Sequence, residues 1–218
     1  MKIVKMGIGA WIGLGMISGV WADMAVITPS GRNLEPGQLA LEFENQQVKR
    51  GDVRYYMARY GLKQNLELST ITLDENFNGG ERRTMVNLQF LQTPESTLTS
   101  GLAVGIWDLQ DQDDKGLGRS YYLVTERTLL QPQGQVVEHF GYAWSGHALN
   151  GFFGGMVFRS RQGYELAAEH SPRTGFNVQG RYRLSDQLQL RVGSFDGDFT
   201  FGVWFQTQPP SQRRRSPW

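Results

Sequence analysis

The sequence predicts an all-β protein, an antiparallel up-and-down transmembrane β-barrel of about twelve strands. Apolar and polar residues alternate with a period of two through four successive runs between residues 150 and 206, which indicates strands with two different faces. Similar runs recur along the chain without a helical period between them. The 27 glycines among 218 residues suit tight turns and closely approaching strands.

The amino-terminal residues have the three parts of a secretory signal peptide. Lys2 and Lys5 precede an uncharged segment that ends in Val20-Trp21-Ala22, so we expect cleavage after Ala22 and export. A retained anchor helix is the alternative, although the apolar run is short for a span of about 20 residues. Cleavage removes two of 22 basic residues and leaves 20 against 21 acidic ones. This balance gives no strong field for nucleic acid.

The rest of the chain divides into three parts by composition. After the signal peptide at 1–22, we expect an irregular lead-in at 23–37, a β-barrel domain at 38–206 and a basic Pro/Arg tail at 207–218. With strand boundaries set to within about two to four residues, the predicted strands are 38–46, 53–61, 64–73, 82–91, 98–108, 119–127, 135–144, 150–159, 163–170, 174–184, 187–194 and 198–206. An even number places both ends of the barrel on one side of a membrane.

Overall composition agrees with a barrel and excludes some alternatives. A mean hydropathy of −0.41 excludes a bundle of membrane-spanning helices, whereas a barrel's polar lumen dilutes its hydropathy. The absence of cysteine excludes a disulfide framework and a lipid-modified anchor. The two longest and most acidic connections, 74–81 and 108–118, both follow odd-numbered strands, where the longer outer loops of such a barrel belong.

The alternation assigns side chains in the last strands to two faces. The charged face forms a predicted lumen network, consisting of Glu165, Glu169, Arg181, Arg183, Gln189 and Arg191. The apolar face is predicted to contact lipid and consists of Phe176, Val178, Tyr182, Leu184, Leu188, Leu190, Phe199, Phe201 and Phe205. A half-buried soluble sheet gives the same alternation, so this pattern alone leaves that alternative open.

Short turns predict which residues face each other across neighbouring strands. Asp196-Gly197 is a two-residue hairpin signal that places Val192 opposite Phe201. Short connections at 172–174 and 185–187 place Glu165 opposite Arg181 and Arg183 opposite Gln189, and Arg181 then faces Arg191. Two arginines directly opposite are unfavourable alone, so the glutamates must offset them across a shared inner surface.

Tyrosine and tryptophan gather near the predicted strand ends, where a membrane interface favours them. Both residue types are also favoured in strands generally. The aromatic girdle predicted from this pattern would include Tyr55, Tyr56, Tyr60, Trp107, Tyr121, Tyr122, Tyr142, Trp144, Tyr164 and Trp204.

Motifs for catalysis, cofactors or metals are absent from the sequence, and we predict none of these sites and no cofactor. The three histidines are too scattered for a metal site by spacing. A hydrolytic site could be assembled only in space, from Ser145, His147 or His170 with nearby acids. Asp108, Asp111, Asp113 and Asp114 lack the closing glutamate of a calcium loop, which favours a solvated loop.

A resemblance covers about a quarter of the chain and is carried by residues of low specificity. From Phe152 to Phe205 the sequence reads FFGGMVFRSRQGYELAAEHSPRTGFNVQGRYRLSDQLQLRVGSFDGDFTFGVWF. This succession resembles the hairpins of bacterial outer-membrane β-barrels and, more narrowly, the YjbH-like family linked to exopolysaccharide export. The chain departs from that family in its shorter length. It also departs from the usual barrel ending, because Gln206, Thr207 and a Pro/Arg tail follow Phe205.

The sequence therefore favours an exported bacterial outer-membrane barrel with a structural or transport-associated role, rather than an enzyme. Its expected partners are membrane lipid and the barrel-assembly machinery, and the resemblance adds polysaccharide-export components. Two alternatives stay open. One is a soluble periplasmic barrel that holds an apolar ligand against an inward-facing aromatic surface, and the other is an outer-membrane lipid hydrolase.

Overall fold

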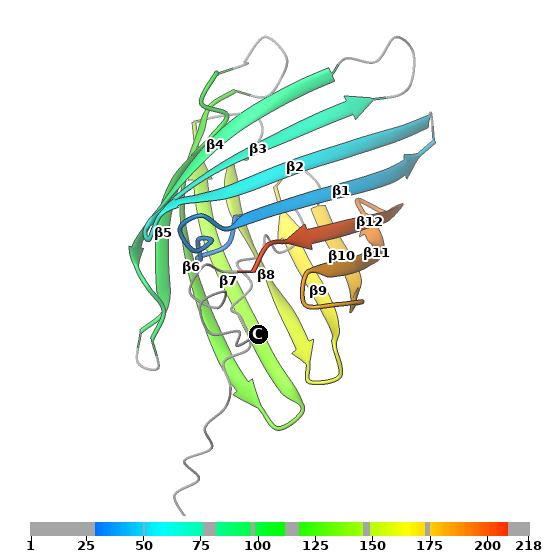
Figure 1. Ribbon diagram of the computed structural model, residues 1–218. Coiled ribbons are helices and arrows are strands. Elements are labelled where there is room, and N and C mark those ends of the chain that lie inside the picture. The colour runs from blue at the N-terminus through cyan, green and yellow to red at the C-terminus, as the bar shows by residue number, and fades with distance from the viewer. Residues whose placement is uncertain are drawn as a thin grey trace, which may run out of the picture.

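The computed structural model describes residues 29–49, 51–75, 82–96, 99–111, 118–145, 149–172 and 175–208. These residues form a closed barrel in which each strand pairs antiparallel with its neighbours in sequence (Figure 1). The strands are β1 (Leu39–Val48), β2 (Gly51–Lys63), β3 (Leu66–Glu75), β4 (Arg82–Thr93), β5 (Gly101–Trp107), β6 (Ser120–Gln131), β7 (Gly134–Trp144), β8 (Gly151–Ser160), β9 (Tyr164–Ser171), β10 (Gly175–Arg183), β11 (Leu188–Phe195) and β12 (Asp198–Gln206). The predicted fold class is confirmed.

The barrel closes where β1 meets β12. Their pairing runs from Ala40 opposite Gln206 to Gln46 opposite Thr200. Beyond the last pair, the Leu39 N–H donates to Thr207 Oγ1 at 2.9 Å, and the Thr207 N–H donates to the Leu39 carbonyl at 2.9 Å. Gln38 Nε2 adds a bond of 3.0 Å to the Thr207 carbonyl. The residues on both sides of the barrel domain thus extend the seam.

The two ends of the barrel differ in their connections. We call the end where β1 begins and β12 finishes the terminal end, and the opposite end the loop end. The long acidic connections follow β3 and β5 and so lie at the loop end, as predicted. The β6–β7 and β8–β9 hairpins, by contrast, project at the terminal end (Figure 1), and Leu130 on the first of them is 83% exposed.

The predicted facing pairs are confirmed. Glu165 lies opposite Arg181, Arg183 opposite Gln189, and Arg181 opposite Arg191. Val192 lies opposite Phe201 beyond the turn at Asp196-Gly197. In this turn both residues have positive φ, 51° and 84°, as a type I′ hairpin requires.

The outer surface of β9 to β12 is apolar and aromatic. Phe176 is 64% exposed, although its strand is paired on both sides. Six further members of the predicted lipid-facing set are also exposed, namely Val178, Tyr182, Leu184, Leu190, Phe199 and Phe201. Leu188 and Phe205 are partly exposed. The alternative in which this aromatic face turns inward is therefore wrong.

The aromatic girdle was only partly predicted. Tyr56, Tyr60, Tyr142, Trp144 and Tyr164 are exposed on the outside. Trp107, Tyr122 and Trp204 instead point inward and are buried, at 6%, 3% and 1% exposure. Proximity to a strand end does not decide the face of a side chain, because the face changes with every residue.

Within the described residues, no helix is long and apolar enough to cross a bilayer, a test that does not bear on strands.

Two glycines on neighbouring strands provide a test of the strand packing. A Cβ at Gly193 would lie 2.2 Å from the Val178 carbonyl oxygen, whereas at Gly180 the nearest atom would be 3.7 Å away. We expect Gly193→Ala to lower the free energy of unfolding by about 1–3 kcal/mol through overpacking. Gly180→Ala should change it by less than about 0.5 kcal/mol. Urea unfolding in lipid, followed by tryptophan fluorescence, measures both, and equal effects would contradict the described packing.

Candidate functional site

The lumen is the candidate site, because the charged side chains of the barrel converge there. One row of directly opposite positions runs around the barrel from β1 through β12, β11, β10 and β9 to β8. Its members, in that order, are Glu44, Gly202, Arg191, Arg181, Glu165 and Arg159. These positions point inward, and the five charged side chains are all buried. We call the inner surface of β8 to β12 and β1 the polar wall.

The six residues predicted for the lumen network lie on the polar wall. Glu169, Gln189, Arg181, Arg191 and Glu165 are at most 3% exposed. The Arg183 side chain, near the terminal end, is 28% exposed. The alternation also places Asn177 and Gln179 on this face, although the predicted network did not include them, and Glu42, Glu44 and Arg159 were missed. The alternation in β1, where the outward-facing Leu41 and Phe43 alternate with Glu42 and Glu44, is the signal that could have identified the two glutamates.

Glu165 is the centre of the charged part of the polar wall. Its carboxylate lies 3.6 Å from Arg159, 3.7 Å from Arg181 and 3.7 Å from Arg183. One acid therefore offsets three cations from neighbouring strands. Because the Glu165 side chain is only 3% exposed, its charge is stabilised by these arginines rather than by water.

Amide side chains connect this cluster to β1. Gln179 Nε2 donates to Glu44 Oε1 at 2.7 Å, and Gln179 Oε1 accepts from Arg181 Nε at 2.6 Å. The first bond passes over two intervening strands, whose inward positions include Gly193 and Gly202. Arg191 similarly reaches across β12 to pair with Glu42, and its guanidinium lies 5.7 Å from the Trp204 ring.

The opposite inner surface carries a buried apolar cluster, which the sequence did not predict, beside buried polar side chains that include Arg59, Glu67, Gln89 and Glu126. Inward side chains from β2 to β8, together with Leu149, form one buried cluster of Met57, Ile71, Met85, Ala103, Trp107, Tyr122, Val124, Ala143, Leu149 and Phe153. We call this the apolar wall. Here the strands carry apolar residues on both faces, so their alternation in sequence is weak.

The lead-in lies inside the lumen at the terminal end. The Gly31 N–H donates to Glu126 Oε2 at 3.0 Å, and the Leu34 N–H donates to Glu67 Oε2 at 2.8 Å. Arg32 Nε lies 2.6 Å from Glu126 Oε1, and its guanidinium also contacts Glu95 and Thr128. Residues 29–38 are therefore held by carboxylates of the barrel, which nothing in their sequence had indicated.

Gly61 on β2 and the ion pair between Arg59 and Glu67 allow the lead-in to lie against the inner surface of the barrel. A Cβ at Gly61 would lie 2.2 Å from the Glu35 carbonyl oxygen, so only glycine lets the lead-in pass this close to β2. The Glu67 carboxylate that receives Leu34 is itself held by Arg59, through bonds of 2.7 and 3.0 Å. Gln89 Nε2 donates to the Arg32 carbonyl at 3.0 Å, and its Oε1 accepts from Tyr122 at 2.9 Å.

Parts of the lumen are tightly packed in this conformation. Side chains that line a water-filled channel are exposed to it, yet Asn177 and Gln179 on the polar wall have no exposed surface. Val124 on the apolar wall has none either, and Glu126 beside the lead-in is 4% exposed. Side chains and the lead-in together thus exclude water from these parts of the lumen.

The residues considered for hydrolysis are not brought together by the described structure. His170 is exposed on the outward face of β9, Ser145 follows β7, and β8 separates these two strands. His147 lies outside the described residues. In the acidic loop, Asp113 and Asp114 also lie outside them. Asp108 is fully buried, with its N–H bonded to Asn87 Oδ1 at 2.9 Å, so the interpretation of that residue as solvated was wrong. No group of three or more metal-ligand side chains occurs within the described ranges.

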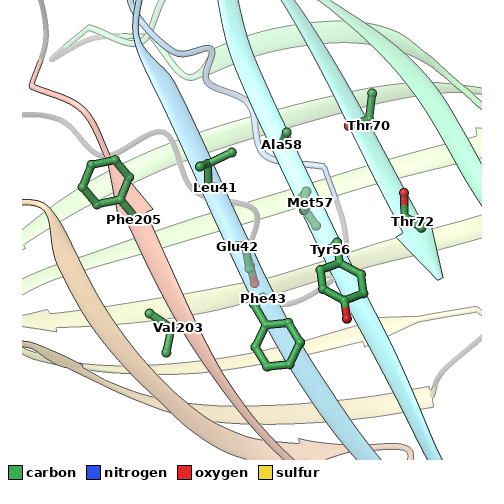
Figure 2. Close-up of a pocket in the computed structure, with 10 residues that line it drawn as sticks. All are labelled: Leu41, Glu42, Phe43, Tyr56, Met57, Ala58, Thr70, Thr72, Val203 and Phe205. Atoms are coloured by element: carbon green, nitrogen blue, oxygen red, sulfur yellow. The ribbon is translucent and has the colours of Figure 1, made fainter. Parts of the chain in front are cut away.

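An apolar groove of about 440 Å³ lies on the outside of the barrel, over β12, β1, β2 and β3 (Figure 2). Leu41, Phe43, Tyr56 and Phe205 are among its lining residues. Leu41 and Tyr56 are exposed on the outer surface, so the groove opens to the outside of the barrel.

The Glu165 cluster generates a stability prediction. Replacement by Gln removes the charge that offsets three arginines, so we expect Glu165→Gln to lower the free energy of unfolding by about 3–5 kcal/mol. Asp186→Asn, in the exposed turn after β10, should change it by less than about 0.5 kcal/mol. Chemical unfolding of both variants in the same lipid makes the comparison. A loss below about 1 kcal/mol for Glu165→Gln would show that the cluster does not depend on this carboxylate.

No family model and no curated protein matches this sequence, so the resemblance to the YjbH-like family gains no support. Solved structures do match. A structure described as "KdgM porin" is 12% identical, with a TM-score of 0.52, and the match covers 78% of this chain and 98% of that one. A second, "KdgM porin in complex with disordered oligogalacturonate", is 14% identical with the same TM-score and coverage. The chain has the porin-like fold of these closed barrels.

Proposed function

We propose that this protein is a bacterial outer-membrane β-barrel with a transport- or secretion-associated role, closed in the described conformation. The observation that carries the proposal is the inverted distribution of side chains. A closed sheet presents Phe176, Tyr182 and Leu190 outward, while Arg181 and Arg191 are buried within. In water such an outer surface would be a large apolar patch, whereas in lipid it is the expected boundary.

The proposed location also agrees with the beginning of the chain. A signal peptide at residues 1–22 would direct export, and a transmembrane barrel then depends on the barrel-assembly machinery and on membrane lipid. Neither catalysis nor a cofactor is part of this proposal.

A closed lumen argues against an open diffusion pore. The lead-in is held inside the terminal end of the lumen, and we infer that it leaves ions no continuous path in this conformation. We therefore infer that transport, where it occurs, requires a conformational change. A role that accompanies polysaccharide export is a finer form of the proposal, supported only by the resemblance of residues 152–205.

An oligosaccharide channel is the second candidate, favoured by the likeness to the KdgM structures and by the arginines and amides of the polar wall. The charge balance bears on the kind of sugar. Five glutamates and four arginines are buried on the inner face of the described strands. They are Glu44, Glu67, Glu126, Glu165, Glu169, Arg59, Arg159, Arg181 and Arg191. This lumen is not strongly cationic, so a neutral oligosaccharide suits it better than a polyanionic one. Sugar uptake into proteoliposomes tests this candidate.

A charge on the outer surface distinguishes a membrane barrel from a soluble one. Leu190 is 44% exposed on β11, and in lipid we expect Leu190→Arg to cost about 2–4 kcal/mol. On a soluble protein the same exposed substitution should cost less than about 0.5 kcal/mol. The readouts are detergent-dependent extraction, heat-modifiable gel migration and urea unfolding in lipid.

The matched control is Leu130→Arg, on the β6–β7 hairpin that projects at the terminal end. Leu130 is 83% exposed, and on this projecting hairpin we expect it to lie in water rather than lipid, so the substitution should change the free energy of unfolding very little. Recovery of the native protein in the periplasmic wash, with a neutral Leu190→Arg variant, would contradict the membrane assignment.

The wild-type protein in a planar bilayer should show no stepwise conductance, and steady open steps would overturn the closed state.

A further inference from the structure

The lead-in is attached to the lumen by contacts different from those of the strands. Apart from the turn at residues 36–37, its described part has no regular structure, yet Ser30, Leu34 and Gln38 are at most 3% exposed. Its N–H groups at Gly31 and Leu34 donate to the carboxylates of Glu126 and Glu67. These are bonds to side chains of β3 and β6, whereas Gly37 and Gln38 are bonded through the backbone to Gly61 of β2. Residues 29–36 can therefore leave while 37–38 stay bonded to the sheet.

Charge makes Arg32 the principal attachment of the lead-in. Its guanidinium contacts the carboxylates of Glu126 and Glu95 together with the Thr128 hydroxyl. Charge-assisted bonds of this kind are roughly twice as strong as neutral ones. Both Arg32 and Glu95 are 15% exposed at their side chains, so water can reach the edge of this contact.

We propose that residues 29–36 are a releasable plug, latched by Arg32, and that its release opens the terminal mouth of the lumen to cations. This inference rests on the proposed function, because it assumes a membrane barrel that is closed at rest. The plug fills the mouth in the described conformation. Arg32 is the one basic residue within 29–36, so loss of its contacts removes the cationic attachment of the plug to the wall.

The charge left behind determines which ions the open mouth prefers. Without Arg32, the arginines of the lumen contacts described above are Arg59, Arg159, Arg181, Arg183 and Arg191, against glutamates Glu42, Glu44, Glu67, Glu95, Glu126, Glu165 and Glu169. Acids outnumber bases in this set, and the carboxylates of Glu67, Glu95 and Glu126 face the space that the plug vacates. A pore lined by an excess of carboxylates selects cations.

Gly31 offers a second, purely steric way to release the plug. A Cβ at this position would lie 2.5 Å from Glu126 Cβ and 2.9 Å from the Glu126 backbone nitrogen, so even Gly31→Ala pushes the plug away from β6. The substitution lies outside every strand and leaves the sheet intact. Gly180→Ala is the matched control, because its new methyl group meets no atom closer than 3.7 Å.

The experiment uses the full chain, which contains no cysteine, so one introduced thiol reports on the plug alone. Ser30→Cys is placed where the side chain is buried, and Ser185→Cys, in the exposed turn after β10, gives the rate of an accessible thiol. Both are reacted in proteoliposomes with thiol reagents of positive and of negative charge. Heat-modifiable migration verifies that each variant is folded.

We expect the thiol of Ser30→Cys to be protected in the otherwise unchanged chain and in combination with Gly180→Ala. Adding Arg32→Ala or Gly31→Ala should raise its labelling rate at least about tenfold, the change that corresponds to about 1.4 kcal/mol, and more for the cationic reagent. In planar bilayers the same two variants should conduct and prefer cations, while the wild-type protein stays silent.

Other outcomes overturn the inference in distinct ways. Rapid labelling of Ser30→Cys in the unaltered background would show that the lead-in does not plug the mouth. Protection in both release variants would show that neither Arg32 nor the fit at Gly31 holds it. Labelling without conductance would show that the wall side chains alone close the barrel. Failure of every variant and of the wild-type protein to insert into membranes would instead count against the proposed function.

Discussion

Closure of the sheet between β1 and β12 is the constraint on which the rest of the structure depends. In lipid no water is present to bond an exposed strand edge, so each backbone N–H and C=O must find its partner within the protein. The pairing of Ala40 with Gln206 through Gln46 with Thr200 supplies those partners at the last open edge. Once the sheet is closed, alternation sends every second side chain inward, and the inner and outer surfaces acquire different chemistry.

The inner surface meets the demand for dense packing in two ways. The apolar wall from β2 to β8 fills its share of the lumen with methionine, valine and aromatic side chains, much as a soluble core does. The polar wall instead uses long charged and amide side chains that bridge over glycines at 193 and 202. Because buried charges are stable only when paired, the arginines and glutamates of this wall lie close to partners of opposite charge, and Glu165 lies near three arginines.

The last third of the chain could be predicted from sequence because its two faces differ so strongly. Phe176, Tyr182 and Leu190 alternate with Arg181, Arg183 and Arg191, and short turns determine the register, so the facing pairs followed by counting. In the middle of the chain, Tyr122 and Val124 point inward while Tyr121 and Leu123 point outward, and no contrast in polarity separates them. The position of the lead-in was beyond prediction, because Arg32 finds its carboxylates on strands that lie far away in sequence.

The internal position of residues 29–38 also constrains the order in which the molecule is assembled. This segment leads directly into β1, which is one side of the seam, and its bonding partners lie on β3 and β6. If the seam formed first, the segment would have to enter a finished ring through its mouth. Insertion before the final pairing avoids that step, and in that order the carboxylates of Glu67 and Glu126 would receive the segment before the sheet closes around it.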